Sequence, residues 1–484
     1  MRPLTNPNID RQPTSRRDFL RTAGGGFGMI ALTALLAEQG LLKAADSGEV
    51  ASANPLAPKQ SHRTAQAKRV IFLFMSGGPS HLETFDPKPD LRRLHGERLP
   101  ESFGAVKTRR GVEKNRLLAT KRTFKKYGES GMDVSDLFPH TAQSVDDLCL
   151  LRGCYGDSVT HPESVYLMNN GSILMGRPSL GSWVTYGLGT ENQNMPAYVV
   201  LPDPGGWVKG GAPAWGNGYL PAAYQGTVIR GGKLPILNLH TPKDITGEQQ
   251  RRTLDLVNQL NQEHLKQRAN DSELSARIAS YELAYRMQSS ATEVVDTAKE
   301  TEATKRLYGL KENATSEFGL RCLLARRMVE RGVRFVQLYC GDTNGWDGHS
   351  DIEGNHGKLA RQCDLPIAGL LKDLKARGLL DSTLVIWGGE FGRTPMSEGN
   401  TGRDHNPHGF CMWLAGGGVK GGQIIGATDA IGLRAVEDRT HVHDIHATIL
   451  HLLGFDHERL TFRHNGRDER LTDTAGKVID KAIA

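Results

Sequence analysis

The sequence is poor in cysteine and in aromatic residues, and it lacks long apolar runs. Its six cysteines in 484 residues include no Cys-x-x-Cys pair, which argues against a thiolate zinc ribbon. No cysteine precedes Cys149, so we expect no lipoprotein anchor. The apolar stretch 22–37 is shorter than the about 20 residues that a spanning helix needs, and no other segment approaches that length. We therefore expect a product that is not embedded in a membrane.

Basic residues exceed acidic ones, but they do not form a nucleic-acid surface. Part of the formal charge of +6 comes from the N-terminal segment and from a basic run at 109–126. That run has Phe124 and Tyr127 nearby but no array of stacking aromatics, so we predict no nucleic-acid partner. An anionic small molecule or polysaccharide suits the run better as a substrate. The glycine-rich stretch 415–422 lacks the Walker order and indicates a tight turn.

The first fifty residues have the order of a twin-arginine export signal. Ser15-Arg16-Arg17-Asp18-Phe19-Leu20 precedes the short apolar stretch, and Ala51-Ser52-Ala53 offers a small-x-small cleavage site. Cleavage after Ala44 or Ala45 is the alternative. The sequence thus predicts a signal at 1–53, the export machinery as a partner, and a periplasmic or extracellular location. Export also permits disulfides, and Cys149 with Cys154 is the candidate pair.

The rest of the chain predicts an α/β fold with a mostly parallel sheet sandwiched by helices. A linker at 54–68 precedes a single domain at 69–475. Continuous apolar runs typical of buried strands alternate with helical patterns. The strands are expected at 69–74, 148–151, 198–201, 333–339, 384–387 and 411–414. The helices are expected at 135–147, 180–187 (capped by Ser179), 359–377 and 442–453. Residues 249–302 lack proline and glycine and predict an inserted helical pair. Residues 204–232 predict a long ordered loop near the ligand edge of the sheet.

Histidines and carboxylates follow these strands repeatedly. In such sheets ligands bind at the carboxyl ends of the strands. His81 and Asp86 follow the first strand, whereas Asp347, His349 and His356 follow the strand at 333–339. Glu390 lies in "GGEFGRTP" after the strand at 384–387, and His405 and His408 lie in "DHNPHG". Imidazoles together with carboxylates are the donor set of zinc or manganese sites, so the sequence predicts a divalent metal, with calcium or magnesium as alternatives.

The order of these motifs resembles the alkaline phosphatase and sulfatase superfamily. "WDGH" at 346–349, "IWGGEFGRTP", "HNPHGF" and "HDIHATILHLLG" carry that resemblance. "SGGPSHLETFDPKP" and "GRPSLGSWVTYGLGTENQNMPAYVVL" resemble the exported domain of unknown function 1501 family over nearly the whole mature chain. The resemblance implies an alkaline phosphatase-like fold. It also implies that Asp347, His349 and His408 match one metal site, and that Glu390 and His405 match part of a second.

Two departures from the superfamily pattern bear on activity. The superfamily has an aspartate directly after its first strand, whereas this chain has Ser76-Gly77-Gly78, so His81 or Asp86 is the expected replacement. The sulfatase motif Cys-x-Pro-Ser-Arg is absent, and 160–164 reads Thr-His-Pro-Glu-Ser. Thr160 is therefore the candidate nucleophile, with His161 as the candidate acid/base group or a further ligand.

Two hypotheses follow for function. The first is a metal-dependent hydrolase of phosphate or sulfate esters, in which Arg393 contacts the anion through its planar guanidinium. The second is a non-catalytic exported protein of the same fold that binds a cell-surface polymer or a partner protein. Trp183, Tyr186, Trp207 and Trp215 are candidates for lining a substrate cleft, with core packing as the alternative for Trp183.

Overall fold

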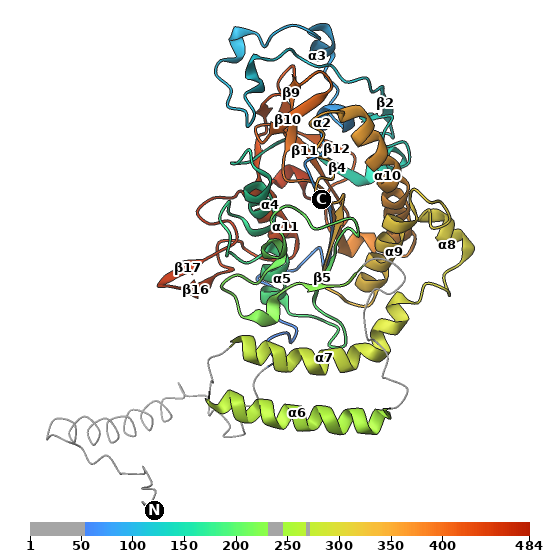
Figure 1. Cartoon of the computed structure of the whole chain (residues 1–484), viewed down its shortest axis with the longest axis vertical. Helices are drawn as coiled ribbons and strands as arrows, with labels where there is room; N and C mark the ends of the chain where they lie inside the picture. The colour runs from blue at the N-terminus through green and yellow to red at the C-terminus, as the bar shows by residue number, and fades with distance from the viewer. Residues whose placement is uncertain (1–53, 231–244, 268–271) are drawn as a thin grey trace, which may run out of the picture. The chain divides into compact units, whose positions relative to one another are not determined.

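The computed structural model describes residues 54–230, 245–267 and 272–484, and the expected signal at 1–53 lies outside them. A nine-stranded sheet forms the centre of these residues (Figure 1). Its strands run in the order β12-β4-β11-β8-β1-β7-β5-β6, with β15 beside β4. They are β1 (Arg69–Met75), β4 (Leu148–Tyr155), β5 (Tyr198–Leu201), β6 (Thr227–Val228), β7 (Phe335–Cys340), β8 (Thr383–Gly388), β11 (Phe410–Ala415), β12 (Gln423–Ile425) and β15 (Thr440–His441).

The sheet is mixed but mostly parallel, as the sequence predicts. The central strand β1 pairs in parallel with both neighbours, so that Leu73 lies opposite Leu338 of β7 and Trp387 of β8. Only β11 runs against its neighbours β4 and β8 among the strands described in this sheet. Parallel strands are buried on both faces, which is why their sequences are continuous apolar runs and do not alternate with polar residues.

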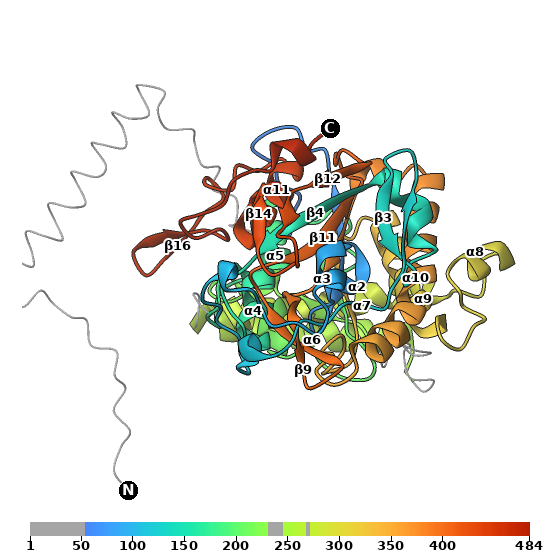
Figure 2. The ribbon, with the colours of Figure 1, turned by 90° about the horizontal axis from the view of Figure 1, so that it is seen from above.

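Helices cover both faces of the sheet (Figures 1 and 2). Ile71, Leu73 and Met75 of β1 belong to a core shared with α9 (Ser316–Glu330) and α10 (Ile352–Ala376). Val70 and Phe72 point to the opposite core, which includes residues of α4 (His161–Asn170), α5 (Leu180–Leu188) and α11 (Val442–Leu452). Each fully buried side chain of this kind contributes about 1.5–3 kcal/mol by leaving water. The sandwich of helices around the sheet is therefore confirmed.

The remaining elements are short helices and two-stranded ribbons. The hairpins pair β2 (Phe124–Tyr127) with β3 (Met132–Ser135), β9 (Gly392–Glu398) with β10 (Gly402–Asn406), β13 (Ala427–Thr428) with β14 (Ala435–Glu437) and β16 (Phe462–His464) with β17 (Arg467–Glu469). The short helices include α2 (His81–Thr84), α3 (Pro89–Arg93) and α8 (Glu302–Leu307). Among the described residues, no helix combines the length and apolar character that a membrane crossing needs.

All six expected strands and three of the four expected helices are present, but the helix expected at 135–147 is wrong. Residues 132–135 form β3, and a 3₁₀ helix follows at Thr141–Asp147. Pro139 lies between them, and a proline disfavours the helical conformation of the residue before it. The capping role expected for Ser179 is confirmed, since its side chain accepts from the backbone amide of Ser182 at 3.3 Å.

The expected helical pair is also present, as α6 (Gly247–Gln267) and α7 (Ser272–Val295). The Arg251 guanidinium of α6 lies 2.7 Å from the Glu282 carboxylate of α7. Ala291 and Val294 of α7 are buried in the core that α9 and α10 share. The pair therefore attaches to the sheet domain through α7 (Figure 1).

The cysteine pair proposed from the sequence is wrong. Cys149 and Cys154 are both free and buried on the single strand β4. Five residues of strand span about 16 Å, whereas the Cα atoms of a disulfide lie about 4–7 Å apart. Burial raises the pKa of the Cys149 thiol to about 12.

Residues 54–68, expected to be a linker, contact the domain. The Lys59 ammonium donates to the Tyr186 carbonyl of α5 at 2.8 Å, and the Ala67 amide donates to the Leu452 carbonyl of α11 at 2.9 Å. These residues therefore pack against two of the helices that cover the sheet.

Candidate metal centre

Four segments bring polar side chains to the carboxyl end of the central strands. Asp347 and His349 lie in the turn after β7, and Glu390 follows β8 directly. Because β7 and β8 run parallel to β1, their carboxyl ends meet at one edge of the sheet. The β9–β10 hairpin adds His405 from β10, and His161 is the first residue of α4.

Asp347 is the centre of this group. His349 Nε2 lies 2.8 Å and His405 Nε2 lies 3.2 Å from Asp347 Oδ1, while His161 Nε2 lies 3.0 Å from Oδ2. One ligand atom from each of the four residues fits within 4.8 Å of all the others. Burial opposes ionisation of Asp347, but its contacts with the three imidazoles and with the Arg393 guanidinium prevail and hold its pKa well below the usual range.

Each of the three imidazoles is fixed at its outer nitrogen. The Nδ1 atoms of His161, His349 and His405 face the Glu390 carboxylate at 2.7 Å, the Glu398 carboxylate at 2.5 Å and the Val159 carbonyl at 2.7 Å, respectively. A carbonyl oxygen only accepts, so Nδ1 of His405 carries a proton, and the same assignment satisfies the two carboxylates. A ring that is protonated only at Nδ1 presents an Nε2 lone pair to Asp347, whereas a doubly protonated ring donates from Nε2 and lowers the pKa of Asp347.

Such an arrangement suits a cation between the acceptors. Burial lowers the pKa of His405 to about 2, so this ring is neutral near pH 7. Its Nε2 nevertheless lies 3.1 Å from His349 Nε2, which is a contact between two lone pairs when both rings are protonated only at Nδ1. The buried Nε2 of His161 contacts Asp347 Oδ2 at 3.0 Å but is not aligned for a hydrogen bond. Atoms that bind one zinc ion at about 2 Å lie roughly 3–4 Å from one another, which matches these separations. The donor set of three imidazoles and one carboxylate therefore fits a divalent zinc or manganese ion.

The turn after β1 supports this group without supplying a ligand. The Gly77 amide donates to the Glu390 carboxylate at 3.0 Å. Gly77 has a φ of +103°, and a Cβ atom there would lie 2.4 Å from the Asn344 carbonyl oxygen. Only glycine lets the turn approach the segment that carries Asp347 so closely.

Arg393 fixes the same turn, which differs from the role expected for it. The guanidinium is fully buried and donates to the Gly78 carbonyl at 3.0 Å, to the Gly77 carbonyl and to Asp347 at 2.8 Å. With its donors used by the protein, Arg393 orients Asp347 and does not face an incoming anion. Lys209, from the loop after β5, places its ammonium 2.6 Å from Asp347 Oδ2 and stays partly exposed.

The structure brings five of the predicted residues together and separates three from them. His161, Asp347, His349, Glu390 and His405 are mutually linked, as described above. His81 instead bonds to the Gly432 carbonyl at 2.8 Å, and Asp86 pairs with Lys88 at 2.9 Å. The half-buried His408 ring hydrogen-bonds to the Lys107 backbone. Burial lowers the pKa of His408. These three lie outside the cluster, because each is held by a partner elsewhere in the fold.

Thr160 lies next to the cluster but does not contact it through a described hydrogen bond. The Thr160 hydroxyl is 3.3 Å from the Ser158 hydroxyl, and Thr160 is the residue directly before α4. The role of Thr160 as a nucleophile stays a prediction.

Sequence reasoning missed three residues of the site. Glu398 holds His349 and is itself paired with Arg110 at 2.8 Å. Asp404 comes close enough to His349 and Glu398 to form a second group of three potential ligands. The turn of the β9–β10 hairpin gave no signal for Glu398, whereas Asp404 beside His405 was visible in "DHNPHG". The only sequence signal for Lys209 was its position in the loop expected near the ligand edge of the sheet. The structure describes that loop as far as residue 230.

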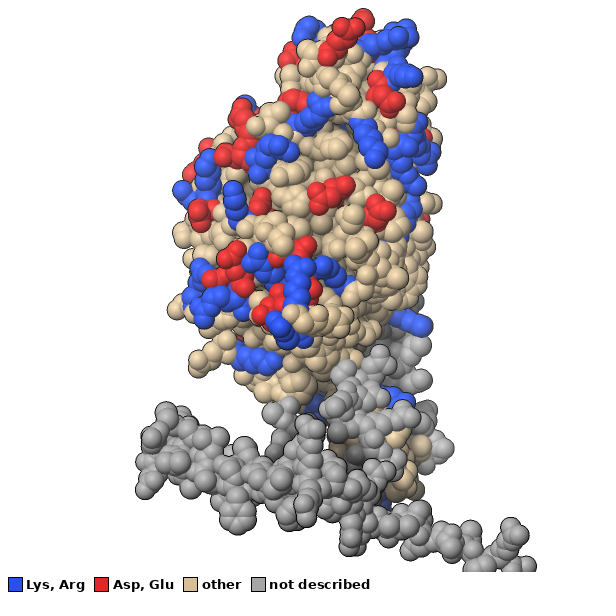
Figure 3. Space-filling view, turned by 90° about the vertical axis from the view of Figure 1, so that its left-hand side faces the viewer, with Lys and Arg blue, Asp and Glu red and all other residues tan. Residues whose placement is uncertain are grey.

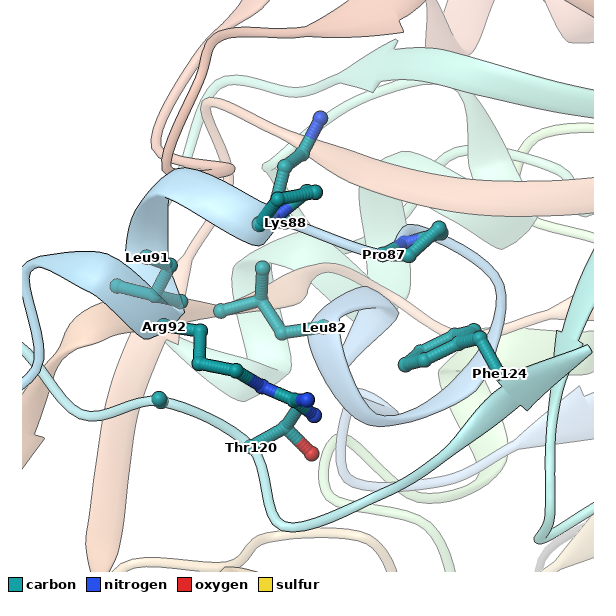
Figure 4. Close-up of a pocket in the computed structure, with 9 residues that line it drawn as sticks. Leu82, Pro87, Lys88, Leu91, Arg92, Thr120 and Phe124 are labelled. Atoms are coloured by element: carbon teal, nitrogen blue, oxygen red, sulfur yellow. The ribbon is translucent and has the colours of Figure 1, made fainter.

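The pocket in Figure 4 is separate from the cluster. It has a volume of about 280 Å³ and is lined by Leu82, Lys88, Arg92, Thr120 and Phe124 among others. Lys88 donates to the Thr428 carbonyl, and Arg92 donates to the Arg122 carbonyl. Since both cations already have partners and none of the cluster residues lines it, the pocket does not belong to the metal centre.

The surface charge is mixed on the face shown in Figure 3, where basic and acidic side chains are interspersed. The net charge of +6 is therefore not concentrated into one continuous basic field on this face. This distribution fits the expectation that nucleic acid is not a partner, which stays a prediction.

The sequence and the fold were compared with known proteins. The family model described as "Protein of unknown function (DUF1501)" matches residues 67–483. No curated protein matches the sequence. Similar solved structures include the lipoteichoic acid synthase LtaP from Listeria monocytogenes, with 10% identity and a TM-score of 0.35 over 87% of this chain and 78% of that chain. They also include the PsFucS1 sulfatase from Pseudoalteromonas sp., with 12% identity and a TM-score of 0.34 over 81% and 68%. The phosphonate monoester hydrolase SpPMH from Silicibacter pomeroyi has 11% identity and a TM-score of 0.31 over 81% and 73%. At these TM-scores the likeness assigns no activity to this chain.

Proposed function

The chain belongs to the family described as "Protein of unknown function (DUF1501)", and we propose that it is an exported, metal-dependent hydrolase of phosphate or sulfate esters. One observation carries the proposal. Three imidazoles from three separate segments are each fixed at Nδ1, so that their Nε2 atoms converge on Asp347. A bound cation stabilises buried lone pairs that face one another in this way.

The residues have distinct parts in this proposal. His161, His349, His405 and Asp347 hold the ion, which supplies Lewis-acid polarisation of an ester oxygen when it is bound. Glu390 and Glu398 fix two of the imidazoles, as hydrogen-bonded carboxylates do in other metal sites. The ion's double positive charge, together with the Lys209 ammonium at the partly exposed side, favours an anionic substrate.

The nucleophile and the location are further parts of the proposal. Thr160 precedes the ligand His161 directly, and we propose that its hydroxyl attacks the phosphorus or sulfur while the bond to the alcohol breaks. The alcohol leaves with a proton equivalent to the one that the hydroxyl loses, and water then hydrolyses the Thr160 ester. The twin-arginine signal at 1–53 supports export to the periplasm or beyond.

A second candidate function is a non-catalytic exported protein that keeps the ion for structure. The observation that favours it is the number of protein donors. Four protein ligands make a closed tetrahedral site, whereas catalytic zinc sites have three and leave the fourth position open. Such a protein would bind a cell-surface polymer or a partner protein through its surface.

Metal analysis of the purified mature protein and a hydrolysis assay separate these functions. We expect bound zinc or manganese in the wild type and its loss in His405→Ala, because the buried site then lacks one donor. His81→Ala is the matched control, since His81 is also a buried histidine and lies outside the cluster. Hydrolysis of aryl phosphates, phosphodiesters or sulfates by the metal-bound protein supports the hydrolase. A metal-bound protein that cleaves none of them supports the structural alternative, and a protein that binds no metal refutes both.

A further inference from the structure

One loop connects the metal centre with an exposed aromatic surface. The loop after β5 contains Trp207 and Lys209, which are two residues apart. Lys209 reaches Asp347, as described above, whereas half of the Trp207 surface is exposed, at 51%. Two residues of chain span at most about 7 Å, so the Trp207 backbone lies within about 7 Å of the backbone of the residue whose ammonium contacts Asp347.

The Trp207 ring is held in a defined position. It stacks on the buried Trp215 with ring centroids 5.2 Å apart and an interplanar angle of 21°. Trp215 in turn packs against Tyr339 at the carboxyl end of β7, with 5.7 Å between the centroids. One face of the Trp207 ring is therefore covered by the protein. The ring already has a fixed orientation before any ligand binds.

Contacts on both sides of Trp207 fix the loop against the site. A Cβ atom on Gly206 would lie 2.5 Å from the Thr343 hydroxyl, in the segment that leads to Asp347. The Tyr166 hydroxyl of α4 donates to the Gly210 carbonyl at 2.9 Å, and α4 is the helix that begins with His161. The loop thus lies between the two segments that supply Asp347 and His161.

The exposed ring of Trp207 is available to a ligand. Tryptophan buries much apolar area when a flat ring stacks on it, and such pairs contribute about 0.5–1.5 kcal/mol beyond that area. Nothing in the contacts of Trp207 requires its outer face to be exposed for folding. An apolar ring next to a fixed ammonium matches a ligand that has a flat ring and an anionic group on adjacent atoms.

We propose that Trp207 and Lys209 form the substrate-recognition part of the site, and that the substrate is an anionic ester whose alcohol carries a flat ring. In this arrangement Lys209 binds an oxygen of the phosphate or sulfate group, and the outer face of Trp207 stacks on the ring. A sugar ring and an aromatic ring share this chemistry. The statement that the substrate is an ester rests on the proposed function. The test does not rest on it, because the test measures binding and not hydrolysis.

The binding of matched anions to the metal-bound protein tests the inference by calorimetry. Phenylphosphonate and methylphosphonate differ only in the ring, and neither is an ester that the protein can hydrolyse. We expect the wild type to bind phenylphosphonate roughly tenfold more tightly, and Trp207→Ala to lose that preference while it keeps its affinity for methylphosphonate. Trp207→Phe keeps a ring and should keep part of the preference. A C-glucosyl phosphonate compared with methylphosphonate, neither of which is an ester, distinguishes a sugar from an aromatic ring.

Lys209 gives the complementary result. Lys209→Met should weaken the binding of both phosphonates by the same factor, and Lys209→Arg should restore part of it, because the charge and not the ring is altered. A wild type without preference for the ring-bearing anion, or a Trp207→Ala protein that retains it, overturns the inference. If the wild type prefers the ring-bearing phosphonate but hydrolyses no ester, the proposed function is refuted and this inference is not. Ester hydrolysis without any ring preference would refute this inference alone.

Discussion

Gly77 offers a sharp test of how the turn after β1 supports the metal centre. A Cβ atom at this position would lie 2.4 Å from the Asn344 carbonyl oxygen, 2.6 Å from the Trp346 amide nitrogen and 2.7 Å from the Asp347 amide nitrogen. All three are backbone atoms, so no side chain can rotate away. The Gly77→Ala protein must move the turn away from Asp347 or adopt another φ, and either change displaces the amide that Glu390 accepts from.

The magnitude follows from two costs. A non-glycine residue at a φ of +103° costs about 1–3 kcal/mol, and forcing an extra methyl group into a packed region costs about 1–3 kcal/mol more. We therefore expect Gly77→Ala to lower the free energy of unfolding by roughly 2–6 kcal/mol. Gly176 is a matched control, because its φ of +101° is nearly the same while a Cβ atom there meets nothing within 4 Å. Gly176→Ala should show the first cost only.

Denaturant unfolding of both variants, with metal analysis of the folded proteins, measures the two effects. Gly77→Ala should be less stable than Gly176→Ala and should also hold less metal, whereas Gly176→Ala should hold as much as the wild type. Equal stability of the two variants, combined with full metal content in both, would show that the close approach of the turn has no part in forming the site.

Three further predictions concern the imidazole partners, pH and export. Glu398→Gln should raise the metal dissociation constant roughly 10–100-fold in a chelator competition, because His349 loses its charged acceptor; an unchanged constant contradicts that role. Burial lowers the pKa of His446 to about 3, so the unfolded chain binds more protons than the folded one between about pH 6.5 and pH 3. The free energy of unfolding should therefore fall as the pH is lowered through this window, more steeply in the wild type than in His446→Gln, and equal slopes in the two titrations argue against it. Replacing Arg16 and Arg17 together by lysine should keep the protein in the cytoplasm of a fractionated cell, and undiminished export would exclude the twin-arginine route.

The sheet could be predicted because its signal is local. A buried parallel strand needs apolar residues at every position, and the runs at 69–74 and 384–387 show this without any knowledge of the neighbours. The helix expected at 135–147 failed because its apolar spacing was read without regard to Pro139. The cysteine pair failed because sequence separation says little about geometry when both residues lie on one strand.

The metal centre could be predicted only in part, for a related reason. Asp347 and His349 follow β7 and Glu390 follows β8, the two strands that flank β1 in parallel, so the topology alone places them at one edge. Glu398 and Lys209 reach the site through a hairpin and a long loop, whose paths depend on tertiary contacts. His81 and Asp86 satisfied the same rule of position as Asp347, yet they are bonded to Gly432 and Lys88. Position after a strand of the sheet is thus not sufficient for a ligand here, and His405, which lies within β10, shows that it is not necessary either.

The separation of the four ligands along the chain has a consequence for how the molecule holds together. His161 and His405 are distant in sequence, and Asp347 and His349 lie between them, so an unfolded chain presents no comparable site. An ion that binds only the native arrangement draws the population toward it by mass action. In the function proposed above, the ion would act as a clasp across the domain, and the zinc or manganese available outside the cell would set how long the protein survives after export.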